Sequence, residues 1–569
     1  MSLFPGLKSL RFVNSVEASR QESQQASQFL IRIAPFGFAA FLLFGGAACA
    51  TPPDPSPPSL SAQVRNADAA YQSLPASLAA YNFTVRELCG AMAVQKPSQF
   101  ASDLKKLGVS FDSPKVGLPL RHVEVPTSPS LASAADAGIP VVAGYDTREA
   151  PLYPPEGLFV DATAIYDRVA GRPRFSLRYR ASKVMLNGRT YKLAADPTGA
   201  GDHLKLRAKR LAKSGFAGMI RPSSMPRKPQ IYLLDPYDPN KTPLLMVHGL
   251  QSTPVAFAAL VNALRSDPEI RAKYQIWQFY YASGTPVLAN AAALRDSLAE
   301  TLHTLDPKDR DAATKRIVVL GHSMGGVISH TLASSSQGRV WGSVFRVPPS
   351  QLRGDPAAIS QLVHILYFRR NPRIVRVIFM AAPHRGSPMA ESFVGFIGNS
   401  LTRLPPMLGR GFSQLARVNP AAMTPGAAAF YKGRFSAVRT LSPKSTALIA
   451  VSELPIEVPF HSVIGQQHQG PKERGSDGVV PYWSSHLSGA QSELVVRSGH
   501  GVIDNPDAMR EVIRILHLEQ RSTQNGTAKN KMPNEKYKSH ITHSSIRIVH
   551  RPDKSAYGCR YVLPGYRMD

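Results

Sequence analysis

A serine between two glycines is the first group in this sequence whose setting suits covalent chemistry. The pattern Gly-x-Ser-x-Gly spans residues 321–325, directly after the apolar run 317–320 and before a helical stretch. Short runs of mostly β-branched apolar residues predict buried strands. Between a strand and a helix, this pattern forms a tight turn that lifts the serine hydroxyl to the helix N-terminus, where developing negative charge is stabilised. We therefore predict that Ser323 is a nucleophile.

A serine hydroxyl needs a base that takes its proton and a carboxylate that orients the base. After a serine on such a turn, the acid comes first along the chain and the histidine second. His500 lies in a loop between the predicted strand 493–496 and the predicted closing helix 506–518, so we predict it as the base. The other histidines considered downstream of Ser323 fit this order less well, and they are His384, His461 and His486.

The predicted acid is Asp477. It follows the predicted strand 461–465 within the segment Gly-Ser-Asp-Gly-Val-Val-Pro, residues 475–481. Glu473 in the same loop is the alternative, and Asp504 comes after the histidine in chain order. An Asp-Gly pair also forms turns without any chemical role, which is the competing interpretation of Asp477.

Negative charge that develops on an attacked carbonyl oxygen needs backbone N–H donors. One donor would come from Met324, the residue after the nucleophile, and the other from Leu250 in the loop after the predicted strand 244–247. His248 and His322 are expected to support these loops. We predict no metal site and no cofactor, because neither histidine has a third ligand at a suitable spacing.

These residues must be positioned by a sheet, and the chain from 230 to 519 has the pattern for one. Apolar runs alternate with helical stretches, which predicts a mostly parallel sheet with helices on both faces, an α/β fold. The predicted strands are residues 230–234, 244–247, 275–281, 317–320, 375–382, 461–465 and 493–496. An inserted helix begins at Asp355-Pro356, and the apolar residues 389–431 predict a helical excursion in the position of a lid.

Residues 61–229 form a separate α+β accessory region without a catalytic motif. Residues 62–92 have helical spacing, and the residues expected near one face are Ala69, Leu74, Leu78, Tyr81 and Leu88. Strand-like segments follow at 141–143, 174–179, 183–186 and 190–193. Asn187-Gly188 between the last two predicts a β-hairpin.

The first 50 residues predict export. The apolar block 33–44 has the length of a signal peptide and is too short for a comfortable membrane span. The small residues that precede Cys49, together with this cysteine, resemble a bacterial lipobox, although Gly46 stands where such boxes usually carry Leu. We expect a lipid anchor on Cys49 at the cell envelope. The alternatives are cleavage after Ala50, which would give a secreted or periplasmic protein, and an uncleaved anchor helix.

The chain is strongly basic, with a formal net charge of +28. It carries no zinc-finger spacing, RRM signature or Walker loop, so nucleic acid is not an expected partner. A generally basic surface is the simplest interpretation, and attraction to an anionic membrane surface is the alternative. Residues 51–60 predict a proline-rich linker, and residues 520–569 a disordered basic tail. Only three cysteines are present, which excludes a disulfide framework.

With these motifs in view, the sequence resembles the α/β-hydrolase superfamily, and within it the bacterial lipase and esterase branch. The resemblance rests on residues 248–250, 321–326, 477–481 and 499–501, and residues 381–388 also resemble lipase-like and GPI-inositol-deacylase-like members. It covers about residues 230–519. It implies hydrolysis of an ester through an acyl-enzyme, with Ser323, Asp477 and His500 as the triad. Residues 60–230, the insertion 336–372 and the tail depart from the family pattern.

The expected partner is therefore an ester or acyl-lipid substrate, because the apolar segment at the lid position suits acyl chains. One alternative is acyl transfer by the same triad to a bound alcohol. The other is a hydrolase scaffold that binds without catalysis and uses residues 61–229 for recognition. The sequence gives no indication of the oligomeric state.

Overall fold

The computed structural model describes residues 58–126, 133–179, 181–203, 228–390, 414–430 and 437–529. The chain divides into two compact units, Met1–Ser59 and Leu60–Asp569, and the second unit holds the sheets. The predicted signal segment, Cys49 and most of the proline-rich linker lie outside the described residues. In the described part of the chain, no helix combines the length and the apolar character that a membrane crossing requires.

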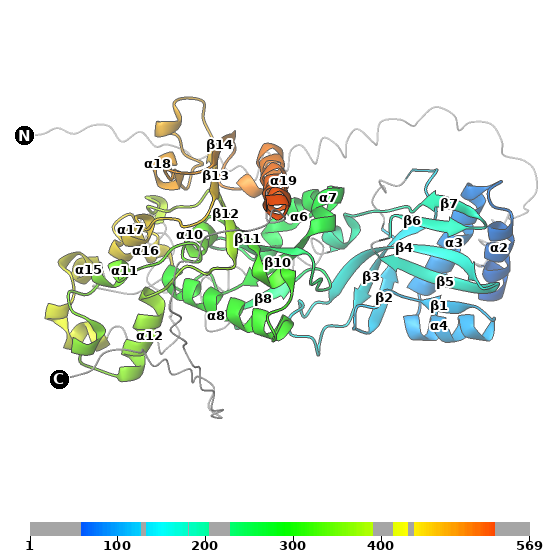
Figure 1. Ribbon diagram of the computed structural model, residues 1–569, viewed down its shortest axis with the longest axis horizontal. Coiled ribbons are helices and arrows are strands. Elements are labelled where there is room, and N and C mark those ends of the chain that lie inside the picture. Colours follow the sequence, from blue (N-terminus) through cyan, green and yellow to red (C-terminus); the bar gives the residue numbers. More distant parts are fainter. Residues whose placement is uncertain are drawn as a thin grey trace, which may run out of the picture. The chain divides into compact units, whose positions relative to one another are not determined.

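A seven-stranded sheet organises the C-terminal part of the second unit, in the order β14-β13-β12-β11-β9-β10-β8 (Figure 1). Its strands are β8 (Gln230–Leu233), β9 (Thr242–Val247), β10 (Tyr274–Tyr280), β11 (Ile317–His322), β12 (Ile374–Met380), β13 (Phe460–Gln466) and β14 (Ser492–Arg497). Neighbouring strands are parallel except β8, which pairs antiparallel with β10. The prediction of a mostly parallel sheet is confirmed, and each predicted strand is present.

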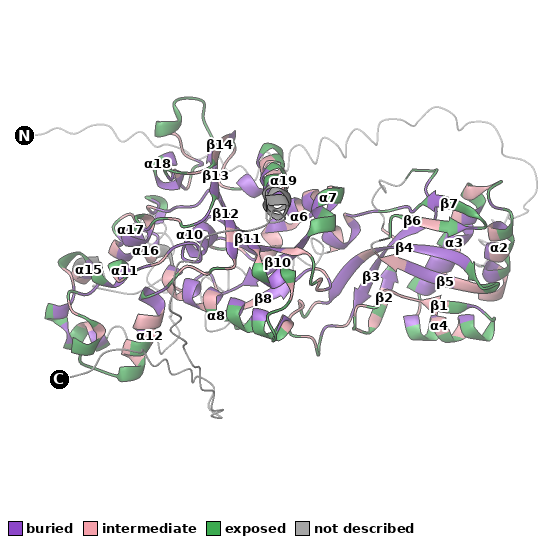
Figure 2. Ribbon diagram, in the orientation of Figure 1, coloured by how far each residue is buried: buried purple, intermediate pink, exposed green. Residues whose placement is uncertain are grey.

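Both faces of this sheet are buried, as parallel strands require. Along β9, Leu245 and Val247 join one apolar core, while Leu244 and Met246 join the core on the opposite face. Apart from the edge strand β14, which is mostly half-buried, the strands are accordingly almost continuously buried (Figure 2). The helices over the first core are α8 (Val287–Leu305) and α10 (Met324–His330), and those over the second are α6 (Ala258–Ser266), α7 (Pro268–Lys273) and α19 (Pro506–Lys529).

Shorter elements fill the connections between these strands and helices. They are η2 (Pro254–Phe257), α9 (Ala312–Lys315), α11 (Arg339–Gly342), η3 (Pro349–Gln351), α12 (Pro356–Leu366), η4 (Pro420–Ala422), α15 (Pro425–Phe430), α16 (Ala437–Thr440), α17 (Thr446–Ser452), η5 (Lys472–Arg474), α18 (Tyr482–Ser485) and η6 (Val502–Asp504). As predicted, Asp355 caps α12, because its side chain accepts a hydrogen bond from the Ala357 N–H. Residues 391–413 and 431 of the predicted lid lie outside the described residues.

The closing helix α19 is longer than predicted, since it continues past Leu518 to Lys529. It is tied to the sheet by a buried ion pair in which the Arg376 guanidinium of β12 lies 2.8 Å from the Glu519 carboxylate. The side chain of Glu519 is also paired with Arg316 at the start of β11. The predicted tail beyond residue 529 lies outside the described residues.

The N-terminal part of the second unit holds a mixed five-stranded sheet in the order β1-β5-β4-β3-β2 and a separate hairpin. Its elements are α2 (Leu60–Gln72), α3 (Leu78–Ala93), α4 (Pro97–Lys106), β1 (Ser110–Asp112), β2 (Leu120–Glu124), β3 (Ile139–Tyr145), β4 (Leu158–Val169), β5 (Arg172–Tyr179), β6 (Lys183–Leu186) and β7 (Arg189–Lys192). The predicted hairpin is confirmed as β6 and β7, with Asn187 and Gly188 both at positive φ in its turn.

The segment 62–92 is helical as predicted, and it consists of two helices separated by a turn at residues 73–77. The break changes which residues face the core. Leu74, Tyr81 and Leu88 are buried as expected, but Ala69 is exposed and Ala67 and Ala70 are buried instead. The α+β character of this region is otherwise as predicted.

Candidate active site

The nucleophile candidate sits on the turn between β11 and α10. Ser323 has φ of +55° and ψ of −127°, a backbone conformation that is rare for residues other than glycine. Its N–H donates a hydrogen bond to the Met380 carbonyl oxygen of β12 at 2.9 Å. A side chain at position 325 would overlap the Val247 carbonyl oxygen, and a Cβ at 321 would lie 2.5 Å from the Gly325 oxygen. Both glycines are therefore needed for the helix to pack this closely against the strands.

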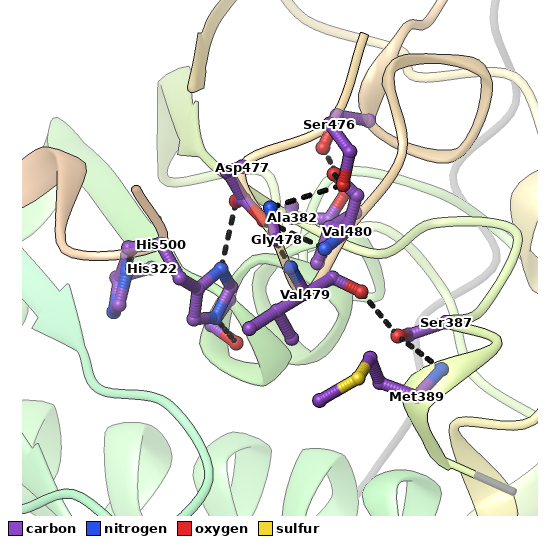
Figure 3. Close-up of polar contacts among 12 residues, drawn as sticks. His322, Ala382, Ser387, Met389, Ser476, Asp477, Gly478, Val479, Val480 and His500 are labelled. Carbon is purple, nitrogen blue, oxygen red and sulfur yellow. Dashed lines mark hydrogen bonds and ion pairs between the residues drawn. The ribbon is translucent and has the colours of Figure 1, made fainter. Parts of the chain in front are cut away.

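His500 bridges the serine and the aspartate. Its Nε2 lies 2.8 Å from the Ser323 Oγ, and its Nδ1 lies 2.8 Å from the Asp477 Oδ2. Because an ionised carboxylate only accepts hydrogen bonds, Nδ1 carries the hydrogen, and in the neutral ring Nε2 then accepts from the serine hydroxyl. Figure 3 shows the His500 ring turned toward the Asp477 carboxylate. The three residues that sequence analysis selected thus form one hydrogen-bonded chain.

Asp477 is held by the loop between β13 and α18. It is 1% exposed, and its Oδ1 accepts hydrogen bonds from the N–H groups of Val479 at 2.8 Å and Val480 at 2.7 Å (Figure 3). These two donors orient the carboxylate so that Oδ2 faces His500. Glu473, the alternative acid, is exposed in η5.

His322 supports the loop that carries His500. Its ring Nε2 lies 2.9 Å from the backbone carbonyl oxygen of His500, and the two ring centroids are 5.2 Å apart. Burial, followed by the neighbouring His500, lowers the pKa of His322 to about 3. The ring is therefore neutral near pH 7 and donates its single N–H to that carbonyl oxygen. Sequence analysis expected a supporting residue here, but the bond to His500 is visible only in the structure.

The two loops chosen for the oxyanion donors meet at the serine. Met324 is the first residue of α10 and is fully buried. Gly249, between His248 and Leu250, comes so close that a Cβ on it would lie 2.9 Å from the Ser323 Cβ and 3.3 Å from its Oγ. Leu250 packs partly buried against the core under α8 and α10.

His248 lies buried at the base of the first of these loops. Its Nδ1 is 3.0 Å from the Gly249 carbonyl oxygen, and its ring stacks on Tyr281 at 4.2 Å between centroids. The Tyr281 hydroxyl donates a hydrogen bond to the His248 carbonyl oxygen at 2.5 Å. Burial lowers the pKa of His248 to about 4, so its neutral ring packs as part of the support under the serine.

The other histidines considered as the base are engaged elsewhere. His461 contacts the Ser492 hydroxyl at 2.7 Å and the Arg376 guanidinium at 2.6 Å. His384 is buried against the ring of His330, and the two Nδ1 atoms are 3.4 Å apart. The third, His486, is paired through Nδ1 with the Glu493 carboxylate at 2.5 Å.

Strand order and the turn at Ser323 together define the architecture of residues 230–529. The chain forms β8, β9, β10 and β11 in sequence, yet β9 lies between β10 and β11 in the sheet, and the strand at the β10 edge is antiparallel. This region has the α/β-hydrolase fold. The hydrolase region, as we call residues 230–529 below, carries the serine turn on its central strand β11.

Comparison with known proteins finds matches among solved structures over about half of the chain. No protein-family model matches the chain, and no curated protein matches it by sequence. Among solved structures, the mature lipase of Bacillus licheniformis is 17% identical with a TM-score of 0.30, and the match covers 50% of this chain and 97% of that one. EstA from Clostridium botulinum is 13% identical with a TM-score of 0.29, covering 47% and 83%. Esterase B from Lactobacillus rhamnosis is 12% identical with a TM-score of 0.28, covering 59% and 99%.

Among the described residues, one group of histidine and acidic side chains is close enough to hold a metal ion. Its members are His122, Glu124 and His203. They belong to the N-terminal region, apart in sequence from every residue of the serine site. Sequence analysis missed this group, since the spacing from 124 to 203 carries no local signal.

Proposed function

We propose that this protein is a serine hydrolase that cleaves carboxylic esters through an acyl-enzyme intermediate. The observation that carries the proposal is the hydrogen-bonded chain from Asp477 through His500 to Ser323, with both contacts at 2.8 Å. A serine, an imidazole and a carboxylate in that order supply a nucleophile, a general base and an orienting group. The strained turn at Ser323 gives further support, because this backbone conformation between a strand and a helix is typical of a nucleophilic serine.

In the first half of the reaction, Ser323 Oγ attacks the ester carbonyl carbon while His500 Nε2 takes the hydroxyl proton. Asp477, ionised and hydrogen-bonded to Nδ1, stabilises the imidazolium that forms. The backbone N–H groups of Leu250 and Met324 would stabilise the oxyanion. His500 then gives its proton to the departing alkoxide, which leaves as the alcohol, and the acyl group stays on the serine.

In the second half, a water molecule repeats the attack on the acyl-enzyme. His500 removes a proton from the water, the C–O bond to Ser323 breaks, and the serine oxygen recovers a proton from His500. The products are a carboxylic acid and the free enzyme. We assign acyl chains as the substrate class on the apolar character of residues 389–431, which follow β12 in the sequence at the position of a lid.

The decisive experiment labels the folded protein with a fluorophosphonate probe and measures hydrolysis of nitrophenyl esters of rising acyl length. Wild type and His303→Gln, a change on the exposed face of α8, should both be labelled and active. Ser323→Ala should lose the label and lose hydrolysis by at least about 1,000-fold. A folded wild-type protein without label would overturn the proposal and favour a binding scaffold.

We further propose that the protein is exported and anchored by lipid on Cys49, on the strength of the small residues that lead to that cysteine. Metabolic labelling with palmitate in a bacterial host tests this. The label should be present in wild type and lost in Cys49→Ser. A label that persists in Cys49→Ser would refute the anchor and leave secretion or the periplasm.

A further inference from the structure

Two histidines and one glutamate of the N-terminal sheet converge on one point. His122 and Glu124 lie two residues apart on β2, the edge strand, so their side chains project from the same face. His203 comes from the helical residues 199–203. The Nε2 atom of His122 is 3.5 Å from Glu124 Oε1, and the Nε2 atom of His203 is 3.4 Å from Glu124 Oε2. Atoms of all three side chains that are able to bind a metal lie within 4.8 Å of one another.

We propose that His122, Glu124 and His203 form a zinc site. Around tetrahedral zinc, bonds of about 2.0–2.1 Å to nitrogen and oxygen place neighbouring ligand atoms roughly 3.3 Å apart. The two nitrogen-to-oxygen distances exceed that value by only a few tenths of an ångström. Two imidazoles with one carboxylate suit zinc and other first-row transition metals, whereas magnesium and calcium prefer an all-oxygen set.

The residues behind the cluster hold the two rings in place. Gly144 is the register partner of His122 on β3, and a Cβ at position 144 would overlap the His122 ring. Phe159, which is 4% exposed, lies 5.7 Å from the His122 ring and 4.9 Å from the His203 ring between centroids. Rings held in this way do not have to be ordered when a metal binds, which favours affinity.

A simple ion pair would also bring one histidine to a carboxylate. It does not explain why the two oxygens of Glu124 face two different histidines, His122 and His203. The carboxyl side chain is half exposed, at 50%, and exposed ion pairs contribute little to stability. A shared cation accounts for the convergence of all three groups and leaves a fourth position for water on the solvent side of Glu124.

The site would link two parts of the chain that are far apart in sequence. His122 and Glu124 belong to the edge strand β2, whereas His203 lies at the end of the described segment 181–203. Zinc bound here would therefore fasten the helical residues 199–203 to the edge of the N-terminal sheet. Because the ion binds the folded state, it should raise the thermal midpoint of this region by mass action.

The test uses the full chain, stripped of metal with a chelator and then titrated with Co²⁺, whose visible absorption intensifies in a four-coordinate site. We expect one equivalent of Co²⁺ to give this absorption and one equivalent of Zn²⁺ to abolish it. Elemental analysis after desalting should find one zinc per chain. His122→Gln, Glu124→Gln and His203→Gln should each lose the absorption and most of the zinc, while His303→Gln should keep both.

One further measurement shows whether a variant that loses the metal is still folded. In metal-free buffer, the circular dichroism of His203→Gln should equal that of metal-free wild type, which shows that the variant is folded. If a variant does not fold, the wild-type titration decides by itself. The proposal is overturned if wild type takes up no equivalent of Co²⁺ with intensified absorption, or if folded His203→Gln keeps the wild-type spectrum and zinc content.

Discussion

The imidazole of His322 donates a hydrogen bond from Nε2 to the backbone carbonyl oxygen of His500, across 2.9 Å. One residue thus joins the turn that carries Ser323 to the loop that carries His500, because His322 directly precedes the serine. Burial keeps the His322 ring neutral, and the carbonyl oxygen beside Nε2 fixes that nitrogen as the one that carries the hydrogen. The position of His500 relative to the serine therefore depends on this bond as well as on Asp477.

Replacing His322 by phenylalanine should slow ester hydrolysis on the order of 100-fold through kcat, with little change in KM. An aromatic ring is kept, but the bond that positions His500 is lost, and small displacements of a reacting group are costly. His322→Gln places an N–H near the same carbonyl oxygen and should restore part of the rate. Steady-state kinetics on a nitrophenyl ester would measure both. Equal rates in the two variants would contradict a positioning role.

Asp477→Asn should lower kcat/KM on the order of 10,000-fold, because an amide holds the imidazole of His500 in the wrong tautomer and cannot stabilise the imidazolium. Glu473→Gln changes an exposed carboxyl in the same loop and should leave kcat/KM within twofold. Labelling with a fluorophosphonate should be slower in Asp477→Asn than in wild type. In Glu473→Gln it should be as fast as in wild type. A large loss in Glu473→Gln with little loss in Asp477→Asn would reassign the acid.

Gly325→Ala should destabilise the fold by about 3 kcal/mol or more, because its Cβ would overlap the carbonyl oxygens of Val247 and His248. Gly342→Ala is the matched control, since a Cβ on Gly342, at the end of α11, meets nothing within 4 Å. That variant should change stability by less than about 1 kcal/mol. Urea unfolding monitored by circular dichroism would measure both. A stable Gly325→Ala would mean that α10 does not pack against β9 as described.

Stability should fall as the pH drops from about 6.5 toward 4, because several histidines are buried in the neutral form. Burial lowers the pKa of His248 and of His330 to about 4 each. The unfolded chain therefore binds protons at these positions below pH 6.5 while the folded chain does not, so protonation favours unfolding in that window. Each such histidine contributes up to about 1.4 kcal/mol per pH unit.

The variant His330→Gln separates this effect from the titration of carboxyl groups. Its free energy of unfolding should depend less on pH between 6.5 and 5 than that of wild type. The slope against pH should be smaller by roughly the amount that one bound proton contributes. Urea midpoints at a series of pH values give the comparison. Identical slopes in the two proteins would show that His330 is not buried in its neutral form.

Much of residues 230–529 was predictable because each strand there is marked by a pattern of neighbouring residues in the sequence. Each strand of their sheet is a short apolar run, since strands covered on both faces need apolar side chains throughout. In the N-terminal region the long strand β4 was not predicted, because polar residues such as Asp161 and Asp167 interrupt its apolar pattern. The separation of α2 from α3 was likewise missed, since the apolar spacing continues across the turn that divides them.

The sequence by itself determined the candidate serine, histidine and aspartate, because a motif and the chain order of strand-end loops point to them without distances. Only the tertiary structure decided that His322 holds the backbone of His500, and that His122 and Glu124 meet His203 from a distant segment. Contacts of that kind depend on register, strand order and the direction of each side chain. Those quantities follow from packing of the whole chain, and no local pattern of residues encodes them.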